Sequence, residues 1–239
     1  MKDNDKKFTL PMLESPRTLR VKFRKVGNLQ YISHLDLQRT FSRVLVRAGL
    51  PLWYTKGFNP HIKMVFGMPL PVGVESECEL LDIRIEREMS CEEVKARLAN
   101  ELTDELMVLE VYPAEHKFAE IGFAAYDFTV KTTGDAAENA DRIKAALSAE
   151  SLVITKKGKA GLREVDILPL IRELTVTVEG DEIKMAAILS AGENNTLSPE
   201  AMMDALRRET GILTGDPTKE YYRILRRRVL AVDGVTEFR

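Results

Sequence analysis

The fold and the main functional candidate both start from one stretch, Arg20 to Lys63, RVKFRKVGNLQYISHLDLQRTFSRVLVRAGLPLWYTKGFNPHIK. It holds nine Lys and Arg side chains and a single acid, Asp36, so its formal charge is +8. The whole chain of 239 residues carries −2, so the other residues together carry −10. Such an imbalance indicates that this segment meets an anionic partner.

The beginning of this stretch predicts a strand followed by a helix. From Thr18 to Lys25, apolar and basic residues alternate, as in a strand with one buried and one solvent-facing side. Ser33 is a favourable N-cap, Asp36 lies at the capping-box position, and Gly49 is a typical helix end. The inward apolar stripe of this helix is Leu37, Phe41, Val44, Leu45 and Ala48, and its outward basic stripe is Arg39, Arg43 and Arg47.

The elements that follow predict an α+β protein of two tandem ferredoxin-like (split β-α-β) units with antiparallel sheets. The first unit combines strands at 18–25, 50–54 with 62–66, 79–86 and 107–112 with helices at 33–49 and 90–102. The second combines strands at 123–131 and 152–155, a hairpin of 173–178 and 183–189, and helices at 136–149 and 198–211, with an irregular run at 156–172. Residues 223–232 fit a helix or a strand, and the repeat favours a strand. The predicted domains are a flexible leader, 1–17, and two units, 18–115 and 116–239.

The composition is that of a soluble globular protein, with 44% hydrophobic and 30% charged residues. No apolar run approaches the roughly 18 residues that a membrane helix needs, and the N-terminus has no secretory pattern. Cys78 and Cys91 form neither a disulfide framework nor a cysteine cluster for an iron–sulfur centre. We therefore expect a cytoplasmic protein without a cofactor or a metal centre.

Charge and aromatic rings together suit single-stranded RNA, because cations track phosphates while rings stack on unpaired bases. Core packing of the rings, plain solvation of the charges, or docking of an acidic protein are the alternatives. The predicted nucleic-acid-binding residues are Arg20, Lys22, Arg24, Arg39, Arg43, Arg47, Trp53, Tyr54, Lys56, Phe58, Asn59, His61 and Lys63. Further cations that would extend the surface are Lys156, Lys157, Lys159, Arg226, Arg227 and Arg228.

His34, Asp36 and His61 are the candidate catalytic residues. The two histidines suit general acid–base chemistry, and the three side chains together offer ligands for a metal ion. Phosphate contact or structural hydrogen bonding is the alternative for each histidine, and helix capping is the alternative for Asp36.

Four ordered motifs, at residues 31–37 (YISHLDL), 47–51 (RAGLP), 57–61 (GFNPH) and 69–76 (PLPVGVES), resemble one family. It is the radical-SAM-linked (radical-SAM-associated) bacterial domain family of unknown function, here in its stand-alone form. The resemblance implies a cytoplasmic role in RNA processing or modification, with a separate radical SAM enzyme or an E/G-type ribonuclease as partner. It implies no catalytic residue.

Two functional hypotheses follow. The first is an RNA-binding accessory module. The second is a metal-independent RNA-processing enzyme that uses His34 and His61, by analogy of fold with CRISPR-RNA-processing endonucleases. A protein-docking adaptor for a radical SAM enzyme is a further alternative.

Overall fold

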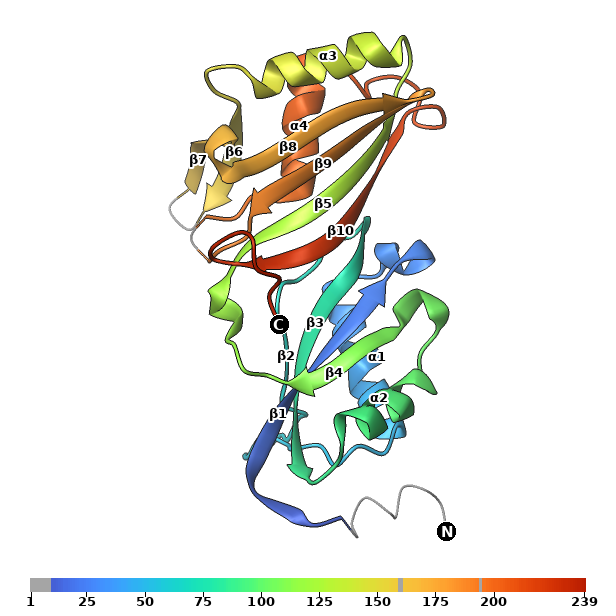
Figure 1. Ribbon diagram of the computed structural model, residues 1–239, viewed down its shortest axis with the longest axis vertical. Coiled ribbons are helices and arrows are strands. Elements are labelled where there is room, and N and C mark those ends of the chain that lie inside the picture. The colour runs from blue at the N-terminus through green and yellow to red at the C-terminus, as the bar shows by residue number, and fades with distance from the viewer. Residues whose placement is uncertain (1–9, 159–160, 194) are drawn as a thin grey trace. The chain divides into compact units, whose positions relative to one another are not determined.

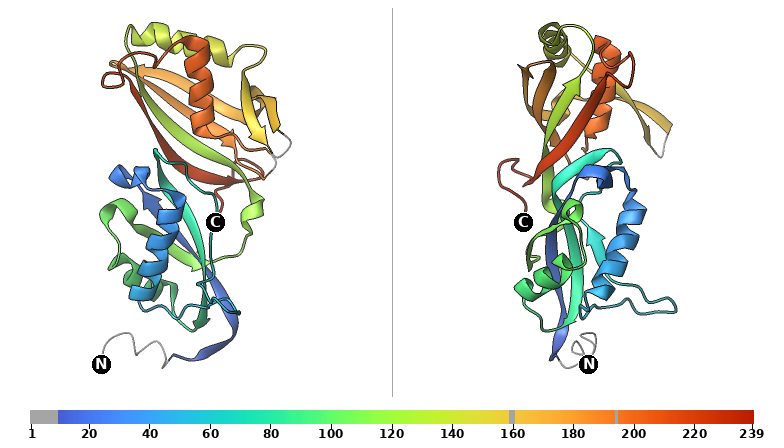
Figure 2. Two further views of the ribbon diagram at one scale, coloured as in Figure 1. Left: turned by 180° about the vertical axis from the view of Figure 1, so that it is seen from behind. Right: turned by 90° about the vertical axis from the view of Figure 1, so that its right-hand side faces the viewer.

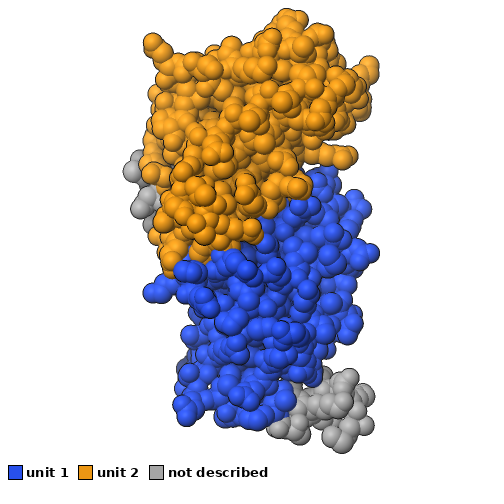
Figure 3. Space-filling model, in the orientation of Figure 1, with its two compact units in different colours: residues 1–118, 239 blue, residues 119–238 orange. Residues whose placement is uncertain are grey.

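A computed structural model describes residues 10–158, 161–193 and 195–239. The chain divides into two compact units, unit 1 with residues 1–118 and 239, and unit 2 with residues 119–238 (Figure 3). Each unit combines helices with an antiparallel sheet, so the predicted α+β class is confirmed. Among the residues described, no helix is both long and apolar enough to cross a membrane.

Unit 1 has the element order β-α-β-β-α-β (Figure 1). Its elements are β1 (Met12–Lys25), α1 (His34–Arg47), β2 (Met64–Phe66), β3 (Val74–Arg87), α2 (Cys91–Ala99) and β4 (Val108–Pro113). Within this unit the strands lie in the order β4-β1-β3-β2, and each pair of neighbours is antiparallel.

Local sequence explains both helices of unit 1. Ser33 Oγ accepts a hydrogen bond from the backbone N–H of Asp36, and Ser90 Oγ accepts one from that of Glu93, so both predicted caps are confirmed. One buried core joins the two helices to the apolar side of β1, and its members include Leu19, Val21, Phe23, Leu37, Phe41, Leu45, Val94 and Leu98. The alternation of β1 thus decides which face of the sheet the helices cover.

Unit 2 has a four-stranded antiparallel sheet in the order β10-β5-β9-β8 and a separate two-stranded hairpin, β6-β7. Its strands are β5 (Ile121–Lys131), β6 (Val153–Gly158), β7 (Gly161–Asp166), β8 (Ile171–Glu179), β9 (Glu182–Ser190) and β10 (Tyr221–Ala231). Its helices are α3 (Ala136–Leu147) and α4 (Pro199–Thr210). Pro199 opens α4 and Gly211 ends it in the left-handed region (φ 74°), as predicted.

Residues 223–232, which fit a helix or a strand, belong to β10 and its end. The pairing of β10 with β5 shifts register between Arg226 and Arg228. Ile224 and Arg226 are buried before this shift, and Val229 is buried after it. One extra residue exchanges the two faces of a strand, so the simple alternation that would have identified β10 is broken.

Three other predictions differ from the structure. The run 156–172 is not irregular, because Gly161–Asp166 forms β7 and pairs with β6. Residues 50–54 do not form a regular strand, since only isolated bridges join Leu52 to Ile85 and Tyr54 to Ile62. The first strand begins at Met12 rather than Thr18, and residues 1–9 of the predicted leader lie outside the described residues.

Glu220 ties the start of β10 to the turn after β5. Its carboxylate accepts hydrogen bonds from Thr133 Oγ1 (2.7 Å), Thr133 N (2.8 Å) and Thr132 Oγ1 (2.9 Å), and from the N–H of Gly215. These donors, the Thr133 hydroxyl foremost, stabilise the ionised form and lower the pKa of Glu220 to about 2. The carboxylate therefore stabilises the fold only when it is charged.

Replacing Glu220 with glutamine is expected to destabilise the protein by about 2 kcal/mol at pH 7. Because the folded pKa lies below the unfolded value, this contribution is complete above about pH 4.5. It disappears as the pH falls through about 2. Urea unfolding of both proteins at several pH values measures the difference. Glu209→Gln, at an exposed position of α4, is the control, and a Glu220→Gln deficit that stays constant down to pH 2 would contradict the account.

Candidate nucleic-acid interface

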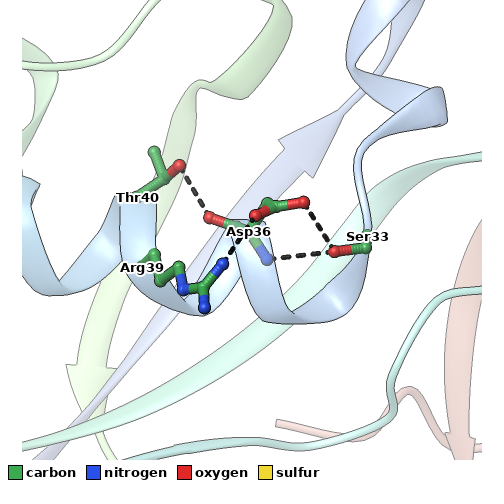
Figure 4. A network of polar contacts seen from close by, with 4 residues as sticks. All are labelled: Ser33, Asp36, Arg39 and Thr40. Atoms are coloured by element: carbon green, nitrogen blue, oxygen red, sulfur yellow. Dashed lines mark hydrogen bonds and ion pairs between the residues drawn. The ribbon is translucent and has the colours of Figure 1, made fainter.

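The first turn of α1 is closed by its own polar side chains (Figure 4). Ser33 Oγ donates to Asp36 Oδ2 (2.7 Å), Arg39 Nη1 donates to Asp36 Oδ1 (3.3 Å), and Thr40 Oγ1 donates to the carbonyl of Asp36 (2.8 Å). Both carboxylate oxygens of Asp36 therefore bond to residues of its own helix or cap. These contacts fit helix capping rather than general-base chemistry.

The two candidate histidines have different neighbours. The ring of His34 meets Phe66 edge-on, with centroids 5.1 Å apart, in the aromatic cluster that also includes Phe41. His61 is exposed, and its Nδ1 lies 3.0 Å from Thr55 Oγ1. Phe66, which contacts His34, lies five residues beyond His61, and five residues of extended chain span about 16 Å, so the structure does not bring the two rings together.

No metal site links these side chains. In the described parts of the chain, no three His, Cys, Asp or Glu residues gather in a way that would hold a metal ion. The set His34, Asp36 and His61 is therefore not assembled as a group of ligands.

Arg20, a predicted nucleic-acid contact, is a buried structural residue. Its side chain is 0% exposed, and it donates to both carboxylate oxygens of Asp82 (2.7 and 2.8 Å) and to the carbonyl of His116 (2.8 Å). Its guanidinium lies 4.2 Å from the centroid of the Phe118 ring, and that ring covers Gly67, where an added Cβ would be 2.5 Å from it. This corrects the prediction for Arg20, because a buried guanidinium has no access to a phosphate.

The other predicted nucleic-acid contacts of β1 either form a hydrogen bond or lie opposite an acidic residue. Lys22 is half-buried and pairs in register with Glu110 of β4. Arg24 Nε donates to the carbonyl of Asp104 at 2.6 Å. The sheet face that carries these residues is thus of mixed charge, and it is a weaker candidate for phosphate binding than the alternation suggested.

The outward side of α1 remains positive. Arg39 and Arg47 are exposed and form ion pairs with Asp36 (3.3 Å) and Glu101 (2.7 Å). Exposed pairs of this kind contribute only up to about 1 kcal/mol, so an incoming phosphate can compete for either guanidinium. For Arg43, between them, the described residues provide no hydrogen bond or ion pair.

The segment after α1 sends its two rings to opposite sides. Trp53 and Tyr54 are consecutive residues of extended chain, so their side chains point in opposite directions. Trp53 lies beside Arg84, whose guanidinium is 5.6 Å from the ring. Tyr54 follows the buried Leu52 on the helix side and is 43% exposed. The predicted ring residues therefore do not form one stacking surface.

Beyond Tyr54 the chain makes a loop that projects from unit 1 near the C-terminal end of α1 (Figure 2). Backbone hydrogen bonds from Thr55 N to His61 O (2.9 Å) and from Lys63 N to Trp53 O (3.2 Å) close its base. Phe58, near the tip, is fully exposed. The other exposed polar residues of the loop are Lys56, Asn59, His61 and Lys63.

Part of the predicted set is exposed on α1 and on the loop that follows it, and Lys63, next to Ile62, points to the side of Trp53. We define the basic surface by its exposed members, Arg39, Arg43, Arg47, Lys56, Phe58 and Lys63. Val46 of α1 and Tyr54 line the same pocket, so the end of the helix borders the base of the loop. Val46 was not predicted, although its position three residues after Arg43 already placed it on the outward side of α1.

The cations predicted to extend this surface lie in unit 2 and differ in accessibility. Arg226 is buried, which corrects that prediction. Arg227 Nε lies 3.3 Å from Asp127 Oδ2. Lys156 donates to the carbonyl of Thr196, and burial lowers the pKa of its ammonium. Lys159 lies outside the described residues.

Comparisons with known proteins identify a family but no described activity. The model of a family described as "Uncharacterized protein conserved in bacteria (DUF2344)" matches residues 18–199. No curated protein matches.

Two solved structures show only distant likeness. A chain of a Cbf5-Nop10-Gar1 complex has 12% identity and a TM-score of 0.47, over 88% of this chain and 48% of that one. An unknown protein from Galdieria sulphuraria has 9% identity and a TM-score of 0.25, over 89% of this chain and 99% of that one. The present chain therefore spans about half the length of the first of these.

Replacing Arg20 with methionine is expected to lower the stability of the protein by about 3 kcal/mol, because it leaves the Asp82 carboxylate without its partner. Urea unfolding measures this loss. Arg43→Met, which removes an exposed guanidinium, should change stability by less than about 0.5 kcal/mol. An Arg20→Met protein of normal stability would show that the ion pair is not structural.

Proposed function

This chain belongs to the DUF2344 family of uncharacterized proteins conserved in bacteria, and we propose that it is an RNA-binding accessory module that acts through the basic surface of unit 1. One observation carries the proposal. Among the described residues, the exposed side chains of Arg43, Lys56 and Lys63 form no hydrogen bond or ion pair. Exposed cations that have no acidic partner and lie on one unit favour an anionic ligand.

The form of the surface suggests single-stranded RNA. A projecting loop carries Lys56, Lys63 and a fully exposed ring, Phe58. An exposed ring between cations suits an unpaired base with a phosphate on either side, and base stacking adds about 1–3 kcal/mol per base. A duplex would bury its bases and leave such a ring without a stacking partner.

We also propose that the two units are tandem ferredoxin-like domains, residues 18–115 and 116–239, after a leader at 1–17. The strand orders β4-β1-β3-β2 and β10-β5-β9-β8, with antiparallel neighbours in both sheets, support this assignment. The β6-β7 hairpin is then an insertion in the second domain.

The proposed partner is a separate radical SAM enzyme or an E/G-type ribonuclease, to which this protein presents RNA in the cytoplasm. The sequence resemblance over residues 31–76 supports this partner. In the part of the chain that the structure describes, Cys78 and Cys91 do not form a disulfide, which suits a reducing compartment.

The RNA-binding proposal predicts a change in salt dependence. Replacing Arg43, Lys56 and Lys63 with glutamine should weaken binding of a single-stranded RNA roughly tenfold or more. The slope of log K against log salt should fall by about 2, since each lost phosphate contact removes about 0.7. Fluorescence anisotropy at several salt concentrations measures both quantities.

A matched control removes three charges elsewhere. Lys95, Arg163 and Lys219 are exposed and lie outside the basic surface, so replacing them with glutamine should leave the slope nearly unchanged. Equal losses in both triple variants would contradict a defined site. An affinity that does not respond to salt at all would contradict RNA binding and favour the docking of a protein partner.

The enzymatic alternative receives no support from the geometry of His34 and His61. His61→Ala is therefore expected to bind RNA within about threefold of the wild type, and wild-type protein should leave the RNA intact without added metal. Gel electrophoresis after prolonged incubation checks the second point. Cleavage that His34→Ala or His61→Ala abolishes would restore the enzymatic hypothesis.

A further inference from the structure

A small apolar pocket lies where α1 meets the chain that follows it. Its volume is about 250 Å³, and its lining residues are Val46, Leu50, Pro51, Leu52, Tyr54, Glu86 and Arg87. Gly49 adopts a left-handed conformation (φ 63°) and turns the chain after the helix. Hydrogen bonds from Glu86 N to Pro51 O (2.9 Å) and from Trp53 N to Arg84 O (2.8 Å) then hold the returning segment along β3.

Two exposed apolar side chains border this pocket. Leu50 and Leu52 are almost completely buried and form its floor, whereas Val46 and Tyr54 are each 43% exposed. An isolated β-bridge joins the backbone of Tyr54 to that of Ile62. A half-exposed ring beside an apolar floor provides one stacking face for a flat ligand.

One acid and one cation, Glu86 and Arg87, belong to the lining of the pocket, and two further cations lie close to its lining residues in the chain. On α1, Arg43 lies three residues before Val46 and therefore on the same side of the helix. Lys56 follows Tyr54 by two residues and is exposed, without a side-chain partner among the described residues. Ligand pockets for drug-sized molecules begin at about 300 Å³, so this smaller pocket suits a single ring system.

We propose that this pocket receives one unpaired nucleobase of a bound RNA, stacked on Tyr54, while Arg43 and Lys56 contact the neighbouring phosphates. The inference rests on the proposed RNA-binding function and adds the position at which a base is held. An apolar side chain of an acidic peptide is the competing occupant.

The test compares tyrosine variants in binding to a single-stranded RNA of about 12 nucleotides. Tyr54→Ala should weaken binding about tenfold without changing the salt slope, because stacking is lost while the phosphate contacts remain. Tyr54→Phe keeps the ring and should bind like the wild type. Tyr31→Ala removes a ring of unit 1 that is 66% exposed and does not line the pocket, and it should also bind like the wild type.

The outcomes separate this inference from the function on which it rests. If RNA binds with a steep salt slope but Tyr54→Ala is neutral, or is no worse than Tyr31→Ala, the pocket assignment is wrong and the RNA-binding function stands. If RNA does not bind and an acidic, aromatic-containing peptide binds in a Tyr54-dependent manner, the pocket assignment and the RNA-binding function are both wrong. Urea unfolding of each variant excludes loss of folding as the cause of weaker binding.

Discussion

The guanidinium of Arg20 is buried in unit 1, where two hydrogen bonds to Asp82 join β1 to β3. The same group holds the carbonyl of His116 and lies against the ring of Phe118, so the segment after β4 is fixed to the sheet as well. Taking an arginine out of water is tolerable only with such a set of partners. The charge of Arg20, within β1, therefore stabilises the fold and is not available to a ligand.

The two-residue period of extended chain decides which side chains of the basic segment remain available to a ligand. Because Trp53 and Tyr54 point to opposite sides, the aromatic residues of the basic segment divide between the sheet face and the helix side. The sheet face carries acids beside its cations. The helix side has Arg43 and a pocket bordered by Val46 and Tyr54, so cations and a stacking face occur together there.

Features that depend on near neighbours were predictable from the sequence, and those that depend on distant partners were not. The caps at Ser33 and Ser90 need only a residue three positions ahead. The burial of Arg20 depends on an acid 62 residues away. Periodicity alone predicted that this arginine lies on the solvent-facing side of its strand. The bulge near Arg226 hid the alternation of β10 for a related reason, since register is decided by pairing with β5.

Mapping the peptides that cross-link to RNA under ultraviolet light tests the central claim most directly, because it reports where bound bases lie. The account predicts nucleotide adducts on peptides that span the end of α1 and the loop to Lys63, with Tyr54 and Phe58 as the modified residues. It predicts no adduct on β1. Adducts confined to β1 or to unit 2, or none in a complex that binds RNA measurably, would contradict the assignment of the basic surface.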